Sequence, residues 1–263
     1  MKRDGIALTE DELVARTDSN YFAVWPLYSS LGDGGGETRQ RGALTITDSC
    51  TPMANFNNIF VTRPLRDPVP ELRDAIALFD ERRRPFVVRI RDGLDPAAER
   101  ACGELGLVDG GITPGMALAD MGKPGTRVDG LDVRTARDRE TFQAHFEMIV
   151  AAFGVPRQFA EMLLTERFLH MPDVELYVGY LDGKLVASSA LFVTGRTAGI
   201  YNVATLPEVR GRGIGEAMTW HCVRRGAAMG CVAATLQASD MGRPIYERMG
   251  FRLVSPYCTY QRP

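Results

Sequence analysis

Histidine, tryptophan and cysteine are scarce in this chain of 263 residues, which has three, two and five of them. The odd number of cysteines, none in C-x-x-C spacing, argues against both a disulfide framework and a zinc site. We therefore expect no metal, and we interpret the cysteines as small core residues of a protein in a reducing cytoplasm.

The sequence also lacks a charge imbalance and long apolar runs. Its net charge of −2 gives no basic footprint for nucleic acid. No apolar run approaches the ~18 residues of a membrane helix, and residues 1–5 lead into an acidic helix start rather than a signal sequence. With 45% hydrophobic and 24% charged residues, the composition is typical of a soluble globular protein with one large domain or two ordinary ones.

The most informative segment is the glycine-rich stretch 209–215. It lies between a strand-like run, 199–205, and a helix-like run, 216–229. Glycines at every second position let the backbone approach a ligand closely. The N–H groups at the start of the following helix lack partners within it, and they lie at the positive end of its dipole. With two arginines in the loop, this pattern indicates a phosphate or pyrophosphate site.

A cluster of glycine, proline and polar residues at 120–126 is typical of a linker, so we predict one domain of residues 1–126 and another of residues 127–263. In the second domain, hydrophobic periodicity and turn residues predict an antiparallel meander followed by a right-handed crossover to a parallel strand. Its expected strands are 131–135, 175–180, 184–194, 197–205, 231–238 and 251–260, and its expected helices are 138–153, 156–170, 216–229 and 243–249.

The first domain has a similar outline without the glycine loop. Thr9 and Glu12 form a capping box that starts a helix. Further helices are expected at 69–82 and 96–105, and strands at 43–47, 59–62, 85–90 and 115–119. Three prolines between residues 63 and 70 cannot supply a row of free N–H groups. We interpret residues 31–41, which include three consecutive glycines, as a mobile loop.

The second domain resembles the GCN5-related N-acetyltransferase (GNAT) family. Arg210, Gly211, Gly213 and Gly215 fit the family's pyrophosphate signature at every required position, and the segment 245–251 matches its closing tyrosine, glycine and phenylalanine. The resemblance covers about residues 128–263 and implies an α/β mixed-sheet fold. The first domain resembles the same family more faintly, as a degenerate copy that has lost cofactor binding. A separate accessory domain is the alternative.

The resemblance implies that acetyl-CoA is the cosubstrate. The strand ending at Thr205 would splay from the strand starting at Cys231, and the thioester would lie in the gap. The backbone of Val203 and Thr205 would pair with the pantetheine arm. The residues expected around the pyrophosphate are Arg210, Gly211, Arg212, Gly213, Ile214, Gly215 and Glu216. Ser239 stands where many family members carry a cofactor-contacting asparagine, and a serine can still donate a hydrogen bond.

Tyr246 is the predicted catalytic residue, a general acid that protonates the leaving thiolate. A packed core tyrosine is the alternative reading. No carboxylate stands at the family's usual positions for a general base, where this chain has Ala234, Tyr201 and Asn202. Replacements acting through water are Glu147, Glu166, Glu175, His145 and His170, or water alone. We interpret His221 as a core histidine.

Two other nucleotide-binding classes fit poorly. The spacing in 211–215 lacks the last glycine of a Rossmann fingerprint, and no G-K-[S/T] follows a glycine loop as in a P-loop NTPase. The resemblance to the GNAT family therefore implies an N-acetyltransferase for a primary amine on a small molecule or peptide. We expect a cytoplasmic protein, with room for a homodimer and with no nucleic-acid or membrane partner. The alternative is an acyl-CoA-binding sensor without turnover.

Overall fold

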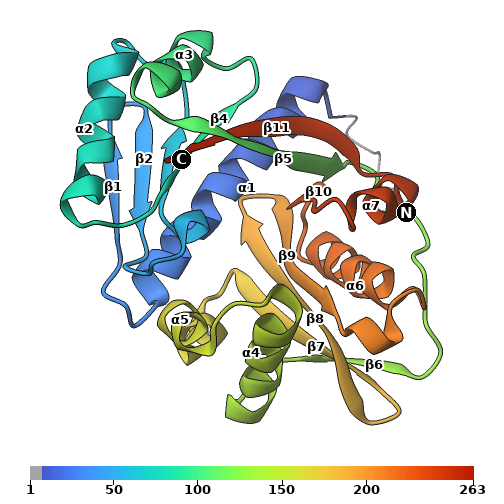
Figure 1. Cartoon of the computed structure of the whole chain (residues 1–263). Helices are drawn as coiled ribbons and strands as arrows, with labels where there is room; N and C mark the ends of the chain where they lie inside the picture. The colour runs from blue at the N-terminus through green and yellow to red at the C-terminus, as the bar shows by residue number, and fades with distance from the viewer. Residues whose placement is uncertain (1–7) are drawn as a thin grey trace. The chain divides into compact units, whose positions relative to one another are not determined.

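A computed structural model of the protein describes residues 8–263, which divide into two compact units. One unit comprises residues up to 21, 115–160 and 166–254, and the other comprises 22–114, 161–165 and 255–263. Each unit combines strands and helices around its own hydrophobic core (Figure 1). The predicted α/β class with a mixed sheet is therefore confirmed. No helix in the range 8–263 combines the length and apolarity needed to cross a membrane.

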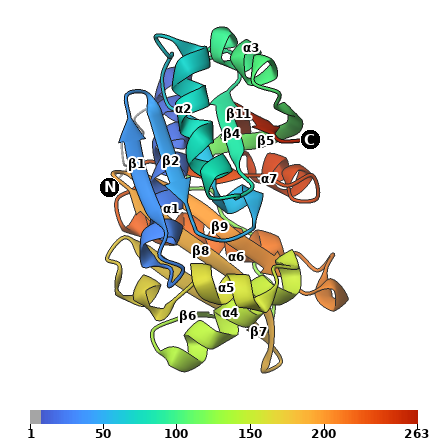
Figure 2. The ribbon, with the colours of Figure 1, turned by 60° about the vertical axis from the view of Figure 1, so that its left-hand side comes forward.

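The first unit contains the meander and crossover predicted from the sequence. Its elements are β6 (Leu131–Thr135), α4 (Arg139–Phe153), β7 (Val174–Leu181), β8 (Lys184–Thr194), β9 (Thr197–Thr205), a short 3-10 turn (Pro207–Val209), α6 (Ile214–Ala228), β10 (Ala233–Gln237) and α7 (Arg243–Met249). Strands β6 to β9 pair antiparallel in chain order, and β10 then pairs parallel to β9. Helices α4 and α6 cover opposite faces of these strands (Figures 1 and 2).

Successive side chains of β8 and β9 point to opposite faces of the sheet, so one set contacts α6 and the other lies on the side of α4. Leu191 of β8 and Ile200 of β9 are registered partners and pack in one core cluster with Met218 and Val223 of α6. Residues one position further along each strand point to the other face, on the side of α4. Helix α4 covers the expected range and begins at a capping box between Asp138 and Thr141, which the sequence analysis did not single out.

The predicted helix 156–170 is wrong as a single element. The structure has a short helix, α5 (Arg157–Leu163), and a separate 3-10 helix (Glu166–His170). Between them, the hydroxyl of Thr165 donates to the backbone carbonyl of Leu31 at 2.7 Å. This bond ties the segment between the two short helices to the end of α1.

The second unit carries four strands, two helices and the far half of a long N-terminal helix. These elements are α1 (Glu10–Leu31), β1 (Glu37–Arg41), β2 (Leu44–Asp48), a 3-10 turn (Ala54–Phe56), β3 (Asn58–Val61), α2 (Pro68–Glu81), β4 (Val87–Arg91) and α3 (Pro96–Glu104). Thr9 and Glu12 form the predicted capping box at the start of α1. Strands β3 and β4 are parallel around α2, which begins at a proline.

The interpretation of residues 31–41 as a mobile loop is wrong for its second half, because Glu37–Arg41 form strand β1 against β2. The last glycine before β1, Gly36, also packs closely. A Cβ atom on Gly36 would lie 2.6 Å from the Ser29 carbonyl oxygen and 2.7 Å from that of Asp48. Glycine is required there for a tight approach of three backbone segments.

Two long strands, β5 (Val108–Leu118) and β11 (Arg252–Gln261), each run from one unit into the other. Residues 115–118 of β5 pair with β10, whereas residues 257–261 of β11 pair with β4. Strand β5, the last strand of the first half of the chain, therefore pairs with a strand of the second half, and β11, the last strand of the second half, pairs with a strand of the first half. The domain boundary between residues 126 and 127 stays a prediction, and no single cut separates the compact units.

Candidate functional site

Strands β9 and β10 diverge soon after they meet. Their registered pairs are Ala233 with Thr197, Ala234 with Ala198 and Thr235 with Gly199. Strand β9 then continues for six residues, 200–205, past its last pair with β10. From residue 200 on, β9 has no registered partner in β10. An extended ligand can pair with a strand edge as an added strand. The predicted splay between these strands is present.

A bulge in β9 lies within the diverging segment. Ala190 and Ser188 of β8 are two residues apart, whereas their partners Tyr201 and Ala204 are three apart. The extra residue accompanies Asn202, whose φ of 53° is left-handed, and the Ser188 hydroxyl donates to its carbonyl oxygen at 3.0 Å. Bulges re-aim neighbouring groups. The sequence analysis missed this one, although asparagine is among the residues that most readily adopt positive φ.

The glycine loop leads directly from the end of β9 into α6. Gly211 and Gly213 have φ values of 77° and 76°, which only glycine adopts at little cost. Gly213 is the N-cap of α6, and the first backbone bond of the helix runs from the Ala217 N–H to the Gly213 carbonyl. The N–H groups of residues 214–216 therefore precede the helical hydrogen bonds, at the positive end of the helix dipole.

The charged side chains of this loop have defined positions. Arg210 donates from Nε to the carbonyl oxygen of Thr205 at 3.2 Å, which holds its guanidinium beside the end of β9. Arg212 is exposed. Glu216 accepts a hydrogen bond from the Thr126 hydroxyl, so its carboxylate is turned toward the segment 120–126. Both cations and the first-turn N–H groups lie around one short loop, an arrangement that suits a diphosphate.

Tyr246 lies on α7 against α6. Its ring meets Phe251 edge-on at a centroid distance of 6.0 Å. Burial raises the pKa of Tyr246 to about 12, and a hydrogen bond with the Thr219 hydroxyl acts in the opposite direction. The same Thr219 hydroxyl lies 2.8 Å from the carbonyl oxygen of Gly215. The predicted acid is therefore connected, through one threonine that the sequence analysis did not single out, to the helix turn that follows the glycine loop.

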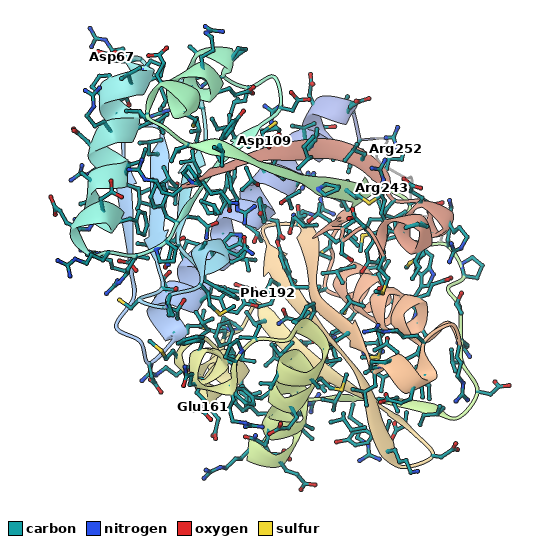
Figure 3. All side chains as sticks on the ribbon, viewed as in Figure 1. Asp67, Asp109, Glu161, Phe192, Arg243 and Arg252 are labelled. Carbon is teal, nitrogen blue, oxygen red and sulfur yellow. The ribbon has the colours of Figure 1, made fainter. Side chains whose placement is uncertain are left out.

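Ser239 follows β10 and is exposed. Its carbonyl oxygen accepts from the N–H groups of Gly242 and Arg243, and its hydroxyl oxygen accepts from Gly242 at 3.2 Å. These bonds fix the turn into α7, which starts at Arg243 (labelled in Figure 3). The Ser239 hydroxyl proton is not used in these bonds, and a serine hydroxyl can donate while its oxygen accepts.

The carboxylates named as replacement bases are all paired with arginines. Arg225 lies 2.6 Å from Glu175 and holds the pKa of that carboxyl below its usual range, and the Tyr177 hydroxyl also donates to it. Arg157 pairs with Glu147 and lowers its pKa. Glu166 lies 3.6 Å from Arg139. A carboxylate stabilised in its charged form is a weaker base.

The histidines are no better placed for proton abstraction. His145 is fully buried, and its Nδ1 lies 3.0 Å from the Tyr177 carbonyl oxygen. Burial lowers the pKa of His145 to about 4. His221 meets the Tyr177 ring edge-on at 4.6 Å, and burial lowers its pKa as well. His170 ends the 3-10 helix after α5.

One group of side chains in the second unit has donor atoms close enough to share a metal ion. Single ligand atoms of Asp92, Glu99 and Cys258 lie within 4.8 Å of one another. Exposed acidic groups commonly gather without a metal, and the predicted acetyl-transfer site lies in the other unit. We therefore assign this group no role.

Comparison with known proteins connects this geometry to a family. Residues 120–243 match the family model described as an acetyltransferase (GNAT) domain. A curated relative, glucosamine 6-phosphate N-acetyltransferase from Trypanosoma brucei brucei, is 30% identical over 97 residues. That match covers 34% of this chain and 60% of the relative. The chain thus spans less than two thirds of the relative's length.

Solved structures resemble the whole chain in fold. A GCN5-related N-acetyltransferase from Kribbella flavida has a TM-score of 0.73 at 17% identity, with 99% of this chain and 97% of that one covered. A tandem GNAT protein of the clavulanic acid biosynthesis pathway has a TM-score of 0.60 at 15% identity, covering 97% and 96%. Both matches extend through the first half of this chain, in agreement with the predicted tandem fold.

Proposed function

We propose that this chain, whose residues 120–243 belong to the acetyltransferase (GNAT) family, transfers an acetyl group from acetyl-CoA to a primary amine. The observation that carries the proposal is the coincidence of two features in one unit. The strands β9 and β10 part after three registered pairs, and the glycine loop with its first-turn N–H groups begins where β9 ends. The first feature suits an extended pantetheine arm, and the second suits a diphosphate.

The residues present fit acetyl-CoA at each predicted contact. The left-handed glycines 211 and 213 let the loop backbone face a diphosphate, and the N–H groups of residues 214–216 would donate to it. Arg210 and Arg212 would add charge. The backbone of Val203 and Thr205 would bind the pantetheine arm, and Ser239 would contact the cofactor through its hydroxyl. Acetyl-CoA supplies the activated thioester.

The chain's own part in the chemistry is to orient the reactants and stabilise the leaving sulfur. The acceptor nitrogen attacks the acetyl carbonyl carbon, and the carbon–sulfur bond breaks. Tyr246, with a pKa of about 12, stays protonated at neutral pH and donates a hydrogen bond to the sulfur. A thiol has a pKa of ~8.5, so complete transfer from this phenol would be uphill by roughly 5 kcal/mol. Tyr246 therefore acts chiefly as a hydrogen-bond donor, and the released proton leaves through water.

One observation favours a second function, an acyl-CoA sensor without turnover. Arginines pair with Glu147 and Glu175 and lower the pKa of each carboxyl, so neither of these two is poised as a base. Acetylation without a dedicated base requires an acceptor amine whose ammonium already loses its proton near neutral pH, or proton removal by water.

Thiol release measured on the whole chain tests both functions. The protein is incubated with acetyl-CoA and a panel of amines that includes glucosamine 6-phosphate, glucosamine, amino-acid amides and peptides, and free CoA is titrated with a thiol reagent. Amine-dependent CoA release is the expected result. Acetyl-CoA binding by calorimetry without release for any amine would favour the sensor, and no binding at all would exclude both.

A further inference from the structure

Gln237, the last residue of β10, has a side-chain amide that no other residue in the described part of the chain satisfies. Its Nε2 and Oε1 atoms are both buried and have no hydrogen-bond partner among residues 8–263. A buried polar atom without a partner costs about 1–3 kcal/mol, so an amide with both ends unpaired is an expensive feature. Such groups call for an explanation, and a ligand that completes the hydrogen bonds is one of the few available.

The position of Gln237 relates it to the gap between the strands. Thr235 and Gly199 form the last registered pair of β10 and β9. Gln237 and Tyr201 each lie two residues further along their strands, so they point to the same face. In a continuous sheet these two would be neighbours. Because the strands diverge, they lie on opposite sides of the gap in which the thioester is proposed to lie.

The face in question is the one opposite α6. Leu236 and Ala238, the neighbours of Gln237, pack in the cluster that contains the buried residues of α6, so Gln237 points the other way. Asn20 of α1 lies on this second face. A Cβ atom on Gly199 would lie 2.0 Å from its Oδ1, and that Oδ1 accepts from the Tyr201 hydroxyl at 2.8 Å.

Asn20 and Tyr201 place uncharged polar groups on this face beside the gap. The Asn20 amide donates to the Phe192 carbonyl (Phe192 is labelled in Figure 3) and to the Thr194 hydroxyl, which fixes its orientation. Tyr201 packs edge-on against Phe192 at 5.3 Å. Tyr246, on α7, packs with the α6 cluster. The two faces therefore carry different groups. The α6 face has Tyr246 as a hydrogen-bond donor for the leaving sulfur, and the opposite face has the neutral amide of Asn20 and the phenol of Tyr201.

We propose that Gln237 is a specificity-determining residue that binds the acceptor on the face opposite α6. Its amide donates one hydrogen bond and accepts another, so it selects primary amines that carry a neutral polar group, a hydroxyl or a carboxamide, beside the nitrogen. The inference rests on the proposed acetyl transfer. An acceptor that enters turns the amide toward itself and satisfies both of its ends.

The test compares Gln237→Leu with Gln158→Leu, the same change at an exposed position of α5. Acetyl-CoA-dependent CoA release is measured with paired amines: ethanolamine against ethylamine, glycinamide against propylamine, and glucosamine against cyclohexylamine. Every kcat/KM is expressed per concentration of unprotonated amine, because the polar member of each pair loses its ammonium proton at lower pH. In wild type we expect the polar member of each pair to have at least about tenfold higher kcat/KM, the effect of one or two hydrogen bonds. Gln237→Leu should abolish that preference and leave the KM for acetyl-CoA within about twofold.

Thermal unfolding without ligand gives a readout independent of turnover. Loss of an unpaired buried amide should leave the Tm of Gln237→Leu equal to or above that of wild type, whereas a structural role would lower it. Turnover with an unchanged amine preference in Gln237→Leu, or a lowered Tm, would overturn the inference and leave the proposed function intact. Absence of turnover with every amine in wild type would refute the proposed function and the acceptor role with it.

Discussion

Placing a carboxylate at the glycine loop should selectively weaken acetyl-CoA binding. We compare Gly213→Asp with Gly213→Asn, since the two side chains have nearly the same shape and both tolerate positive φ. A Cβ atom at Gly213 would lie 3.6 Å from the nearest side-chain atom, of Thr126, so either residue fits sterically. In both variants the left-handed φ of 76° destabilises the folded protein by the same amount, about 1 kcal/mol. Any difference between them in affinity therefore reports charge.

The size of that difference follows from Coulomb's law. A carboxylate ~7 Å from a diphosphate that carries about two charges is repelled by roughly 1 kcal/mol at the dielectric of water and roughly 5 kcal/mol at an effective dielectric of 20. The loop is partly exposed, so we expect the low end of this range. Gly213→Asp should bind acetyl-CoA about 10–100-fold more weakly than Gly213→Asn, and raised salt should narrow the gap.

Calorimetry at two salt concentrations measures the difference in acetyl-CoA affinity between Gly213→Asp and Gly213→Asn. Gly183 provides the backbone control, because it has the same φ of 76°, has open space at its Cβ position and lies in the hairpin turn between β7 and β8. Gly183→Asp and Gly183→Asn should lower thermal stability about as much as the loop variants do and leave affinity unchanged. Equal affinity of the Asp and Asn variants at position 213 would show that the loop does not face the diphosphate.

Two further predictions concern buried titratable groups. Tyr246→Phe should lower kcat by about 10–100-fold, the loss of one hydrogen bond to the developing charge on the leaving sulfur, with the calorimetric Kd for acetyl-CoA unchanged; full activity would remove Tyr246 from the mechanism. For His145, the pKa is about 4 in the folded protein against the ordinary value of 6.5 for an exposed histidine, so between these values only the unfolded chain binds the proton. The neutral, buried His145 therefore contributes fully to the free energy of unfolding above pH 6.5. This contribution of about 3 kcal/mol is lost as the pH falls to about 4. Urea unfolding at pH 7.5 and 5.0 should show a smaller loss of stability in His145→Gln than in wild type or in His170→Gln, and an equal loss in all three would contradict the assignment.

The sequence was most informative where one strong local signal sets an element. The turn Asp182-Gly183 and the alternation around it predict β8 over Lys184–Thr194, and the strand β9 over Thr197–Thr205, with the observed bounds. Helix α7 likewise runs from Arg243 to Met249, because Gly250 adopts the left-handed conformation that ends it. A local signal also predicted the position of the glycine loop, because glycines at alternate positions directly before a helix are uncommon in plain turns.

Other features were invisible because their causes are not local. Strand β1 is polar at all five positions and is ordered by pairing with the buried strand β2. At the break between α5 and the following 3-10 helix, Thr165 donates to a carbonyl 134 residues away. Gln237 reads as an ordinary strand residue, and only the burial of its amide without a partner makes it notable. Side-chain burial and long-range pairing are tertiary properties, and hydrophobic periodicity in one sequence does not encode them.

The exchange of the final strands has a consequence for how acetyl-CoA binding is tested. A cut at the predicted boundary would leave residues 127–263 without Met116 and Leu118 of β5, which are at most 2% exposed and belong to the core cluster around α6. It would also expose the edge of β10, residues 234–237, that pairs with residues 115–118 and ends two residues before Ser239. The same cut would leave residues 257–261 of β11 without β4. If such a fragment failed to bind acetyl-CoA, the lost strand and the damaged core would explain the failure, and the result would not test the glycine loop. The loop can be judged only in the whole chain, where single substitutions at Gly213 change the local charge and leave both strand sets complete.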